Sequence, residues 1–199
     1  MMHSFLLIGQ SNMAGRGFLA DAPALDNHGL YVFRNGRFQP MFRPVNPDRA
    51  FSGTNLSERF ARLYADAYGV EVGVIPCADG GTAIRQWEKG SLLYDNAVNC
   101  ARLAARTSVI AGVLWHQGET DCYGDEPKFY RARLEKLFCD LRRDAGLDGV
   151  PSVVGGLGDY LRDFTDEEVR LNYALITEIT REYAKDTPLV AFADGSELP

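Results

Sequence analysis

The sequence predicts a single α/β domain over residues 1–199, built as a three-layer α/β/α sandwich with about five parallel strands. Short apolar runs alternate with amphipathic stretches along the chain, which is the pattern of repeated strand–helix units. The apolar runs are aliphatic and nearly continuous, as expected for strands that helices cover on both faces. With right-handed crossovers, such a sheet has its site at the carboxyl ends of the strands.

Five apolar runs are the predicted strands, and they cover residues 5–9, 71–75, 109–115, 152–155 and 189–192. Four predicted helices have apolar stripes over residues 56–67, 92–103, 129–141 and 169–179. The third helix is expected to begin near Pro127 and to end near Gly146. The fourth is expected to begin with a capping box from Thr165 to Glu168.

Residues 17–51 break this alternation. They contain a predicted small hairpin, in which residues 31–34 turn at Asn35-Gly36, and then a loop rich in proline and arginine. We expect this segment to be an insertion beside the site.

The composition excludes several classes of protein. Hydrophobic residues make up 46% of the chain and charged residues 24%, which is ordinary for a globular protein. The net charge of −6 argues against nucleic acid or an anionic membrane as partners, because both attract basic surfaces. No apolar run has the length of a signal peptide or a membrane span, so we expect a cytoplasmic protein; a secreted precursor that has lost its signal is the alternative.

The cysteines are widely spaced and show no metal-ligand pattern, so reduced thiols and no bound metal or cofactor are expected. They are Cys77, Cys100, Cys122 and Cys139.

The most informative segment follows the first apolar run. Residues 5–8 lead into Gly9-Gln10-Ser11-Asn12-Met13-Ala14-Gly15, so a serine stands at the turn from a strand into a helix. The strand holds the serine, the glycines permit a tight turn, and the helix N-terminus stabilises negative charge. This arrangement suggests acyl transfer with Ser11 as the nucleophile, although an isolated serine at such a turn is usually only a helix cap.

Three polar segments fall where predicted strands end: Ser11, Gly80-Gly81-Thr82 and Gln117-Gly118-Glu119. In a doubly wound sheet these ends meet at one crevice. Chemistry at an ester needs a nucleophile and donors for the developing oxyanion. The donors could be the N–H of the serine itself, the N–H of Gly80 or Gly81, and the side-chain amide of Gln117.

These segments resemble the sialate O-acetylesterase and acetylxylan esterase group of the SGNH hydrolase superfamily. The resemblance spans residues 5 to about 121 and rests on residues 9–15, on Gly80-Gly81-Thr82-Ala83-Ile84 with Trp87, and on Trp115-His116-Gln117-Gly118-Glu119-Thr120-Asp121. It implies a flavodoxin-like sandwich that removes acetyl groups from carbohydrates without a metal. It also implies Ser11 as the nucleophile and Gln117 as an oxyanion donor.

The general base that the resemblance implies is missing. In the family a histidine in an Asp-x-x-His motif follows the last strand and precedes a C-terminal helix, whereas residues 194–199 contain no histidine. We therefore expect that the chain lacks that loop and helix and is weakly active or inert.

His116 could replace this base, and a buried, hydrogen-bonded histidine is the alternative interpretation. Successive strand residues point to opposite faces, so His116 and Gln117 should not both face the pocket. His3 precedes the first strand and His28 lies in the insertion, so neither is favoured.

The remaining candidates are supporting residues. Gln10 and Asn12 flank the nucleophile, and Glu119 is expected to brace the serine loop by hydrogen bonds. Asp121 is interpreted as a solvated loop residue.

Trp87 could be a sugar-stacking platform or a core residue. Arg85 and Arg16 could contact a carboxylate such as that of sialic acid, although surface arginines are common.

The leading hypothesis is a serine-dependent carbohydrate O-acetylesterase acting on sialic acid, xylan or a related acetylated glycan. A non-catalytic carbohydrate-binding protein on the same fold is the alternative. A flavin or nucleotide binder is disfavoured, because residues 9–15 lack the glycine and hydroxyl density of a phosphate cradle.

Overall fold

One mixed sheet of seven strands organises residues 1–196, which are the residues that the computed structural model describes. The strands are β1 (His3–Gly9), β2 (Leu30–Arg34), β3 (Arg37–Pro40), β4 (Val72–Pro76), β5 (Val109–His116), β6 (Ser152–Gly155) and β7 (Val190–Ala193). Their order is β3-β2-β4-β1-β5-β6-β7, and every pair is parallel except β2 with β3. The predicted α/β class and its five parallel strands are confirmed.

The predicted hairpin is present, and it extends the sheet. Asn35 and Gly36 both have positive φ, the conformation that a tight two-residue hairpin turn requires. β2 also pairs in parallel with β4, so this part of the insertion belongs to the sheet and only the loop around it is additional.

The helices are α1 (Ser11–Ala14), α2 (Leu56–Tyr68), α3 (Leu92–Ala104), α4 (Pro127–Ala145) and α5 (Glu167–Asp186), with short 3-10 turns η1 (Ile84–Trp87), η2 (Glu119–Cys122) and η3 (Asp159–Asp163). As expected, α4 begins at Pro127 and ends before Gly146, which is in the left-handed conformation. The predicted capping box of α5 is wrong by one residue, because Asp166 rather than Thr165 accepts hydrogen bonds from the first free N–H groups.

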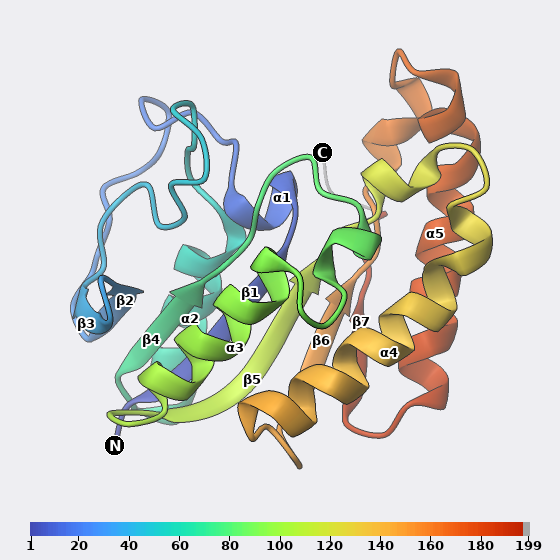
Figure 1. The fold of residues 1–199 in the computed structure, drawn as a ribbon. Helices are drawn as coiled ribbons and strands as arrows, with labels where there is room; N and C mark the ends of the chain where they lie inside the picture. The colour runs from blue at the N-terminus through green and yellow to red at the C-terminus, as the bar shows by residue number, and fades with distance from the viewer. Residues whose placement is uncertain (197–199) are drawn as a thin grey trace.

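Two cores lie on opposite faces of the sheet. Leu6 and Ile8 of β1 face a core shared with α3, α4 and α5, while the alternate residues Phe5 and Leu7 face α2. Figure 1 shows α3 and α4 in front of the sheet and α2 behind it. The three layers therefore follow from strand alternation.

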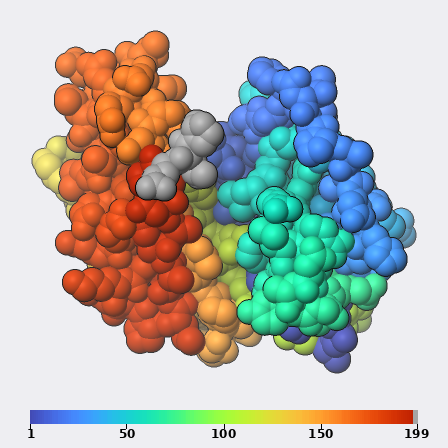
Figure 2. Space-filling model, turned by 180° about the vertical axis from the view of Figure 1, so that it is seen from behind, coloured from blue at the N-terminus to red at the C-terminus, as the bar shows by residue number. Residues whose placement is uncertain are grey.

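Seen from behind, α2 and α5 stand apart, and strands β5 and β6 are visible between them (Figure 2). An apolar groove of about 240 Å³ lies here, lined by residues that include Phe60, Leu114 and Val153.

The order of the strands determines where a site can form. β1 is central, and its neighbours β4 and β5 lie on opposite sides of it, so the chain reverses its direction of winding at β1. The carboxyl ends of these three strands meet at this switch point, which is where open α/β sheets bind ligands. They carry the three polar segments that the sequence analysis singled out.

Within residues 1–196, none of the helices is both long and apolar enough to cross a lipid bilayer. The four cysteines are free thiols in this part of the chain.

Candidate active site

The turn between β1 and α1 presents Ser11. Gly9 has φ +135°, and a Cβ built there would lie 2.1 Å from the backbone oxygen of His116, so only glycine fits against β5. The next residue, Gln10, donates its N–H to that same oxygen at 3.0 Å. β5 thus clamps the turn, and the half-buried Ser11 begins α1.

The start of α1 leaves two backbone donors unused. The N–H groups of Met13 and Ala14 donate to the backbone oxygen of Gln10 at 3.0 and 2.9 Å. Those of Ser11 and Asn12 have no acceptor among the described residues. They are the free N–H groups that any helix start carries, and they lie beside the serine hydroxyl.

The loop after β4 supplies a third backbone donor, and the structure distinguishes between its two glycines. Asp79 donates its N–H to the Gly9 oxygen at 3.0 Å, which fastens the loop to the serine turn. Gly80 donates its N–H to Asp48 at 2.8 Å, so the prediction of Gly80 as an oxyanion donor is wrong. Gly81 is exposed, and its N–H has no acceptor within residues 1–196.

Asp48 anchors this loop to the insertion. Its buried carboxylate accepts hydrogen bonds from Arg16 at 2.7 and 3.0 Å, Ser52 at 2.7 Å and the Gly80 N–H. Burial alone would raise the pKa of Asp48, but the bonds from Arg16 and Ser52 outweigh it and lower the pKa. Arg16 is therefore already paired.

Gln117 follows β5 but is only 1% exposed. Its amide nitrogen donates to Gln10 Oε1 at 3.1 Å, to the Thr82 oxygen at 2.9 Å and to Asp121 Oδ2 at 2.5 Å. An amide has two hydrogens, and both are used, so the geometry does not support direct donation to an oxyanion. Gln117 instead ties the three segments together.

Asp121 is fully buried, not solvated as expected. Its Oδ2 accepts the Ile84 N–H at 2.8 Å as well as the Gln117 amide. Burial raises the pKa of Asp121, while the hydrogen bond from Gln117 opposes that rise. Asp121 connects the second and third segments.

Asn12 links the nucleophile turn to the opposite wall of the site. Its side-chain nitrogen donates to Glu119 Oε1 at 2.5 Å and to the hydroxyl of Tyr160 at 2.7 Å. This contact fits the predicted role of Glu119 as a brace, and it brings in Tyr160, which the sequence analysis did not identify.

Two other candidates do not reach the site. Trp87 is fully buried, donates its indole N–H to Thr82 Oγ1 at 3.1 Å and packs edge-to-face on Trp115, so it is a core residue and the stacking-platform interpretation is wrong. Arg85 is exposed on η1 and does not line the pocket that contains Ser11.

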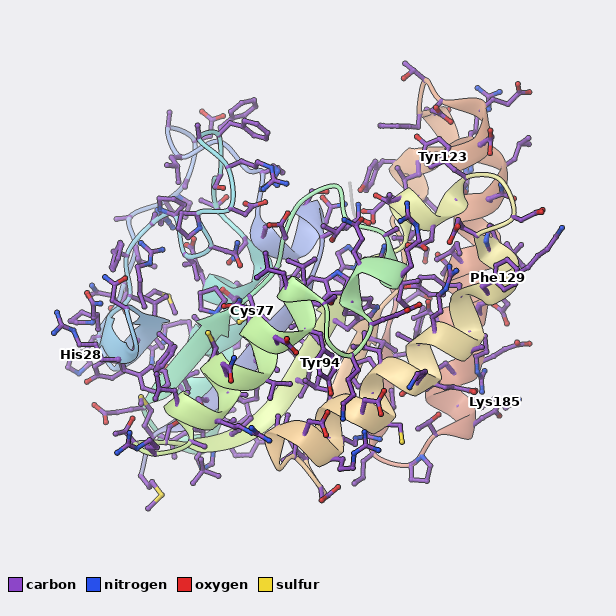
Figure 3. All side chains as sticks on the ribbon, viewed as in Figure 1. His28, Cys77, Tyr94, Tyr123, Phe129 and Lys185 are labelled. Carbon is purple, nitrogen blue, oxygen red and sulfur yellow. The ribbon has the colours of Figure 1, made fainter. Side chains whose placement is uncertain are left out.

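The three histidines lie elsewhere. His116 lines the apolar groove behind the sheet, with its ring against Gly155, as the strand alternation predicts. His3 Nδ1 is 3.0 Å from the hydroxyl of Tyr64. His28 is exposed at the outer edge of the molecule, away from α1 (Figure 3). No histidine of the described chain lines the Ser11 pocket.

Ser11 opens into a pocket of about 320 Å³ between α1 and the turns η2 and η3. It is lined by Gln10, Ser11, Asn12, Glu119, Thr120, Tyr123, Tyr160, Leu161, Phe164 and Val169. The aromatic members were not predicted. The available signal was that residues 156–164 follow the carboxyl end of a strand, as the other polar segments do.

No group of three or more His, Cys, Asp or Glu side chains able to hold a metal ion occurs in the part of the chain that the structure describes.

Known proteins resemble this chain in sequence and in fold. The chain is 29% identical over 213 aligned residues to a probable carbohydrate esterase of Arabidopsis thaliana, At4g34215, covering 93% of this chain and 80% of that protein. The X-ray structure of the Arabidopsis protein AT4G34215 superimposes with a TM-score of 0.85 at 25% identity, over 99% of this chain and 87% of that chain.

Two further solved structures share the fold. NanS superimposes with a TM-score of 0.78 at 16% identity, over 99% of this chain and 78% of that chain. A carbohydrate acetylesterase from Xanthomonas citri gives a TM-score of 0.71 at 21% identity, over 96% of this chain and 49% of that chain.

The class is therefore that of the carbohydrate esterases, hydrolases of esters on sugars. A family model described as carbohydrate esterase, sialic acid-specific acetylesterase matches residues 1–199, and the chain belongs to that family. The resemblance that the motifs indicated is confirmed.

Proposed function

We propose that this protein is a carbohydrate O-acetylesterase in which Ser11 is the nucleophile. The observation that carries the proposal is the position of Ser11, at a turn clamped by β5 and open to a pocket beside unused backbone donors. Family membership supplies the reaction class, and the geometry of the turn supports the choice of nucleophile.

The reaction begins when Ser11 Oγ attacks the acetyl carbonyl carbon. The bond from that carbon to the sugar oxygen then breaks, the sugar oxygen takes a proton from solvent and leaves as the alcohol, and an acetyl-serine is formed. The N–H groups of Ser11 and Gly81 stabilise the oxyanion that develops on the carbonyl oxygen. Water then attacks the acetyl-serine, releases acetate and restores the hydroxyl.

Gln117, Asp121 and Asp48 hold the donors in place. Gln117 and Asp121 join the second and third segments to the serine turn, and Asp48 holds the loop that presents Gly81. Gly80 has no direct role in this scheme, because its N–H donates to the carboxylate of Asp48.

Proton removal from Ser11 is the slow part of this scheme. A base must take the proton from Oγ, and none of the three histidines in the given sequence lines the pocket, which leaves solvent base for these residues. A serine hydroxyl is a weak nucleophile without an adjacent base, and turnover is expected to be slow.

The test is covalent labelling together with acetate release. A fluorophosphonate should add its phosphorus to Ser11, as read by peptide mass spectrometry, and Ser11→Ala should lose both the adduct and the acetate release. Ser196→Ala, a serine outside the pocket, is the matched control and should keep both. Acetate release that survives Ser11→Ala at the wild-type rate would reject the proposal.

The alternative is a sugar-binding protein without turnover, and the lack of a histidine in the pocket is the observation that favours it. It predicts saturable sugar binding with neither adduct nor acetate.

A further inference from the structure

Three aromatic rings form one wall of the Ser11 pocket. Tyr123 follows η2, Tyr160 lies in η3 and Phe164 follows η3, and they are 39%, 46% and 44% exposed. Aromatic rings left partly open in a concave site offer flat apolar faces, which suit the C–H face of a pyranose ring. Tyr123 lies on the side of the molecule opposite the insertion loops (Figure 3).

Hydrogen bonds connect this aromatic wall to the turn that carries the nucleophile. Asn12, the residue after Ser11, donates to the hydroxyl of Tyr160 at 2.7 Å and to Glu119 at 2.5 Å. A sugar stacked on Tyr160 would therefore lie at a fixed distance from Ser11, because the side chain of Asn12 joins the tyrosine to the residue that follows the nucleophile.

The pocket is also anionic. Glu119 is the acidic residue of its lining, and no lysine or arginine of the described chain lines the pocket. The negative charge of Glu119 also affects two neighbouring side chains. Burial, and then the charge of Glu119, raise the pKa of Tyr160; burial, and then the same charge, raise the pKa of Cys122 to about 12.

Arg85 is exposed on η1 and does not line the pocket. Three other arginines near the site segments are already paired. Arg162 of η3 donates to Asp159 at 3.0 Å, and Arg49 donates to Asp79 at 2.8 Å. Arg16 is held by Asp48 as described above. A carboxylate placed in this pocket would face Glu119 without a compensating positive charge.

We propose that the pocket selects neutral acetylated sugars, whose ring stacks on Tyr160, over acetylated sugars that carry a carboxylate, sialic acids included. The proposal rests on Ser11 being the nucleophile and adds the charge class of the substrate. The proposed preference differs from the sialic acid specificity for which the family is named.

The first test compares two substrates that differ in one group: acetylated methyl glucoside and acetylated methyl glucuronoside, with a neutral CH₂OH or a carboxylate at C6. The wild type should prefer the neutral sugar by about tenfold in kcat/KM at low salt, and the preference should shrink as salt screens Glu119. Equal rates, or preference for the uronic acid or for an acetylated sialic acid, would overturn the proposal.

A positive charge placed on the wall should weaken this preference. Phe164→Lys adds a cation and should narrow the ratio at least fivefold, whereas Phe164→Gln, a neutral replacement at the same exposed position, should keep the preference for the neutral sugar. Identical ratios in both variants would contradict an electrostatic origin.

Stacking is tested at Tyr160. Tyr160→Ala should lower the ratio of kcat/KM for the neutral sugar ester to that for ethyl acetate by about tenfold, because ethyl acetate has no ring to stack. Tyr160→Phe keeps the ring and should retain most of this ratio. Tyr68→Ala removes a more exposed tyrosine on α2, outside the pocket, and should change neither rate.

A binding measurement separates this proposal from the proposed nucleophile. Ser11→Ala protein, titrated with the two sugar esters in a calorimeter, should bind the neutral ester more tightly. If labelling and ethyl acetate hydrolysis assign Ser11 but the neutral ester has no advantage, only the substrate class is wrong.

Discussion

Asp48 should be a sensitive anchor outside the reacting groups. It is a buried carboxylate that joins the insertion, through Arg16 and Ser52, to the loop that presents Gly81, through the Gly80 N–H. Asp48→Ala removes all of these bonds at once. The structure therefore predicts a loss of stability together with a loss of esterase activity.

The loss can be sized from the contacts. Hydrogen bonds to a charged group contribute about 1.5–3 kcal/mol each, and those of Gly80 and Ser52 are lost with Asp48. Arg16 is 23% exposed and can be hydrated again, so its share is discounted. A total of about 3 kcal/mol corresponds, for a chain of this size, to a fall in Tm of roughly 6–12 °C.

The pH dependence has a definite sign. The folded-state pKa of Asp48 is lowered below its usual 3.8, so its stabilisation is present above that value and is lost as the pH falls through the folded-state pKa. The difference in Tm between wild type and Asp48→Ala should therefore shrink below about pH 4.

Thermal melts followed by circular dichroism, with acetate release on the same samples, test this reasoning. Asp125→Ala is the matched control, because it breaks a largely exposed ion pair with Lys128 and should cost less than about 1 kcal/mol. Asp48→Ala melting within about 2 °C of the wild type would refute the assigned role of the carboxylate.

Further predictions concern Asp121 and the removal of the proton from Ser11. Asp121→Ala leaves the Ile84 N–H and the Gln117 amide buried without this acceptor, and urea unfolding should show a loss of about 2–6 kcal/mol; a loss under about 1 kcal/mol would contradict the bridge. Because burial raises the folded-state pKa of Asp121, its contribution is complete below the unfolded value and is lost as the pH rises through the raised one. Melts of wild type and Asp121→Asn should accordingly diverge in favour of the wild type as the pH is lowered toward about 4. Added imidazole should accelerate ethyl acetate hydrolysis by the wild type several-fold more than by Ser11→Ala, since no histidine lines the pocket, and equal acceleration of both would refute solvent-base catalysis.

Most of the fold could be predicted, because burial imposes a period on the sequence. The five aliphatic runs became parallel strands and the four apolar stripes became helices, with α4 bounded by Pro127 and Gly146 as expected. The role of the hairpin was missed, since whether β2 pairs with β4 depends on a neighbour about forty residues away rather than on its own pattern.

The site was predicted in outline but not in its contacts. The turn after β1, the loop after β4 and Gln117 are joined by hydrogen bonds, through Asp79 to Gly9 and through Gln117 to Gln10 and Thr82. Which of the predicted donors remains free depends on partners from elsewhere in the chain. Asp48 takes the Gly80 N–H, and Gln10, Thr82 and Asp121 take the Gln117 amide.

The aromatic wall shows the same limit. Nothing in the local pattern of Tyr160 or Phe164 distinguishes a binding ring from an ordinary exposed one, and nothing around Trp87 distinguishes a platform from a core residue. The contact between Asn12 and Tyr160 could not be predicted from a local pattern, because the two residues are 148 positions apart in the sequence.

By itself, the order of residues determined the layered sheet, the position of Ser11 at its central strand and the membership of a carbohydrate esterase family, because periodicity and motifs are local properties. The tertiary structure alone decided which donors stay unpaired, which arginines are neutralised and which rings face the nucleophile. Hydrogen bonds and charges are satisfied between distant segments, and that pairing exists only once the chain has folded.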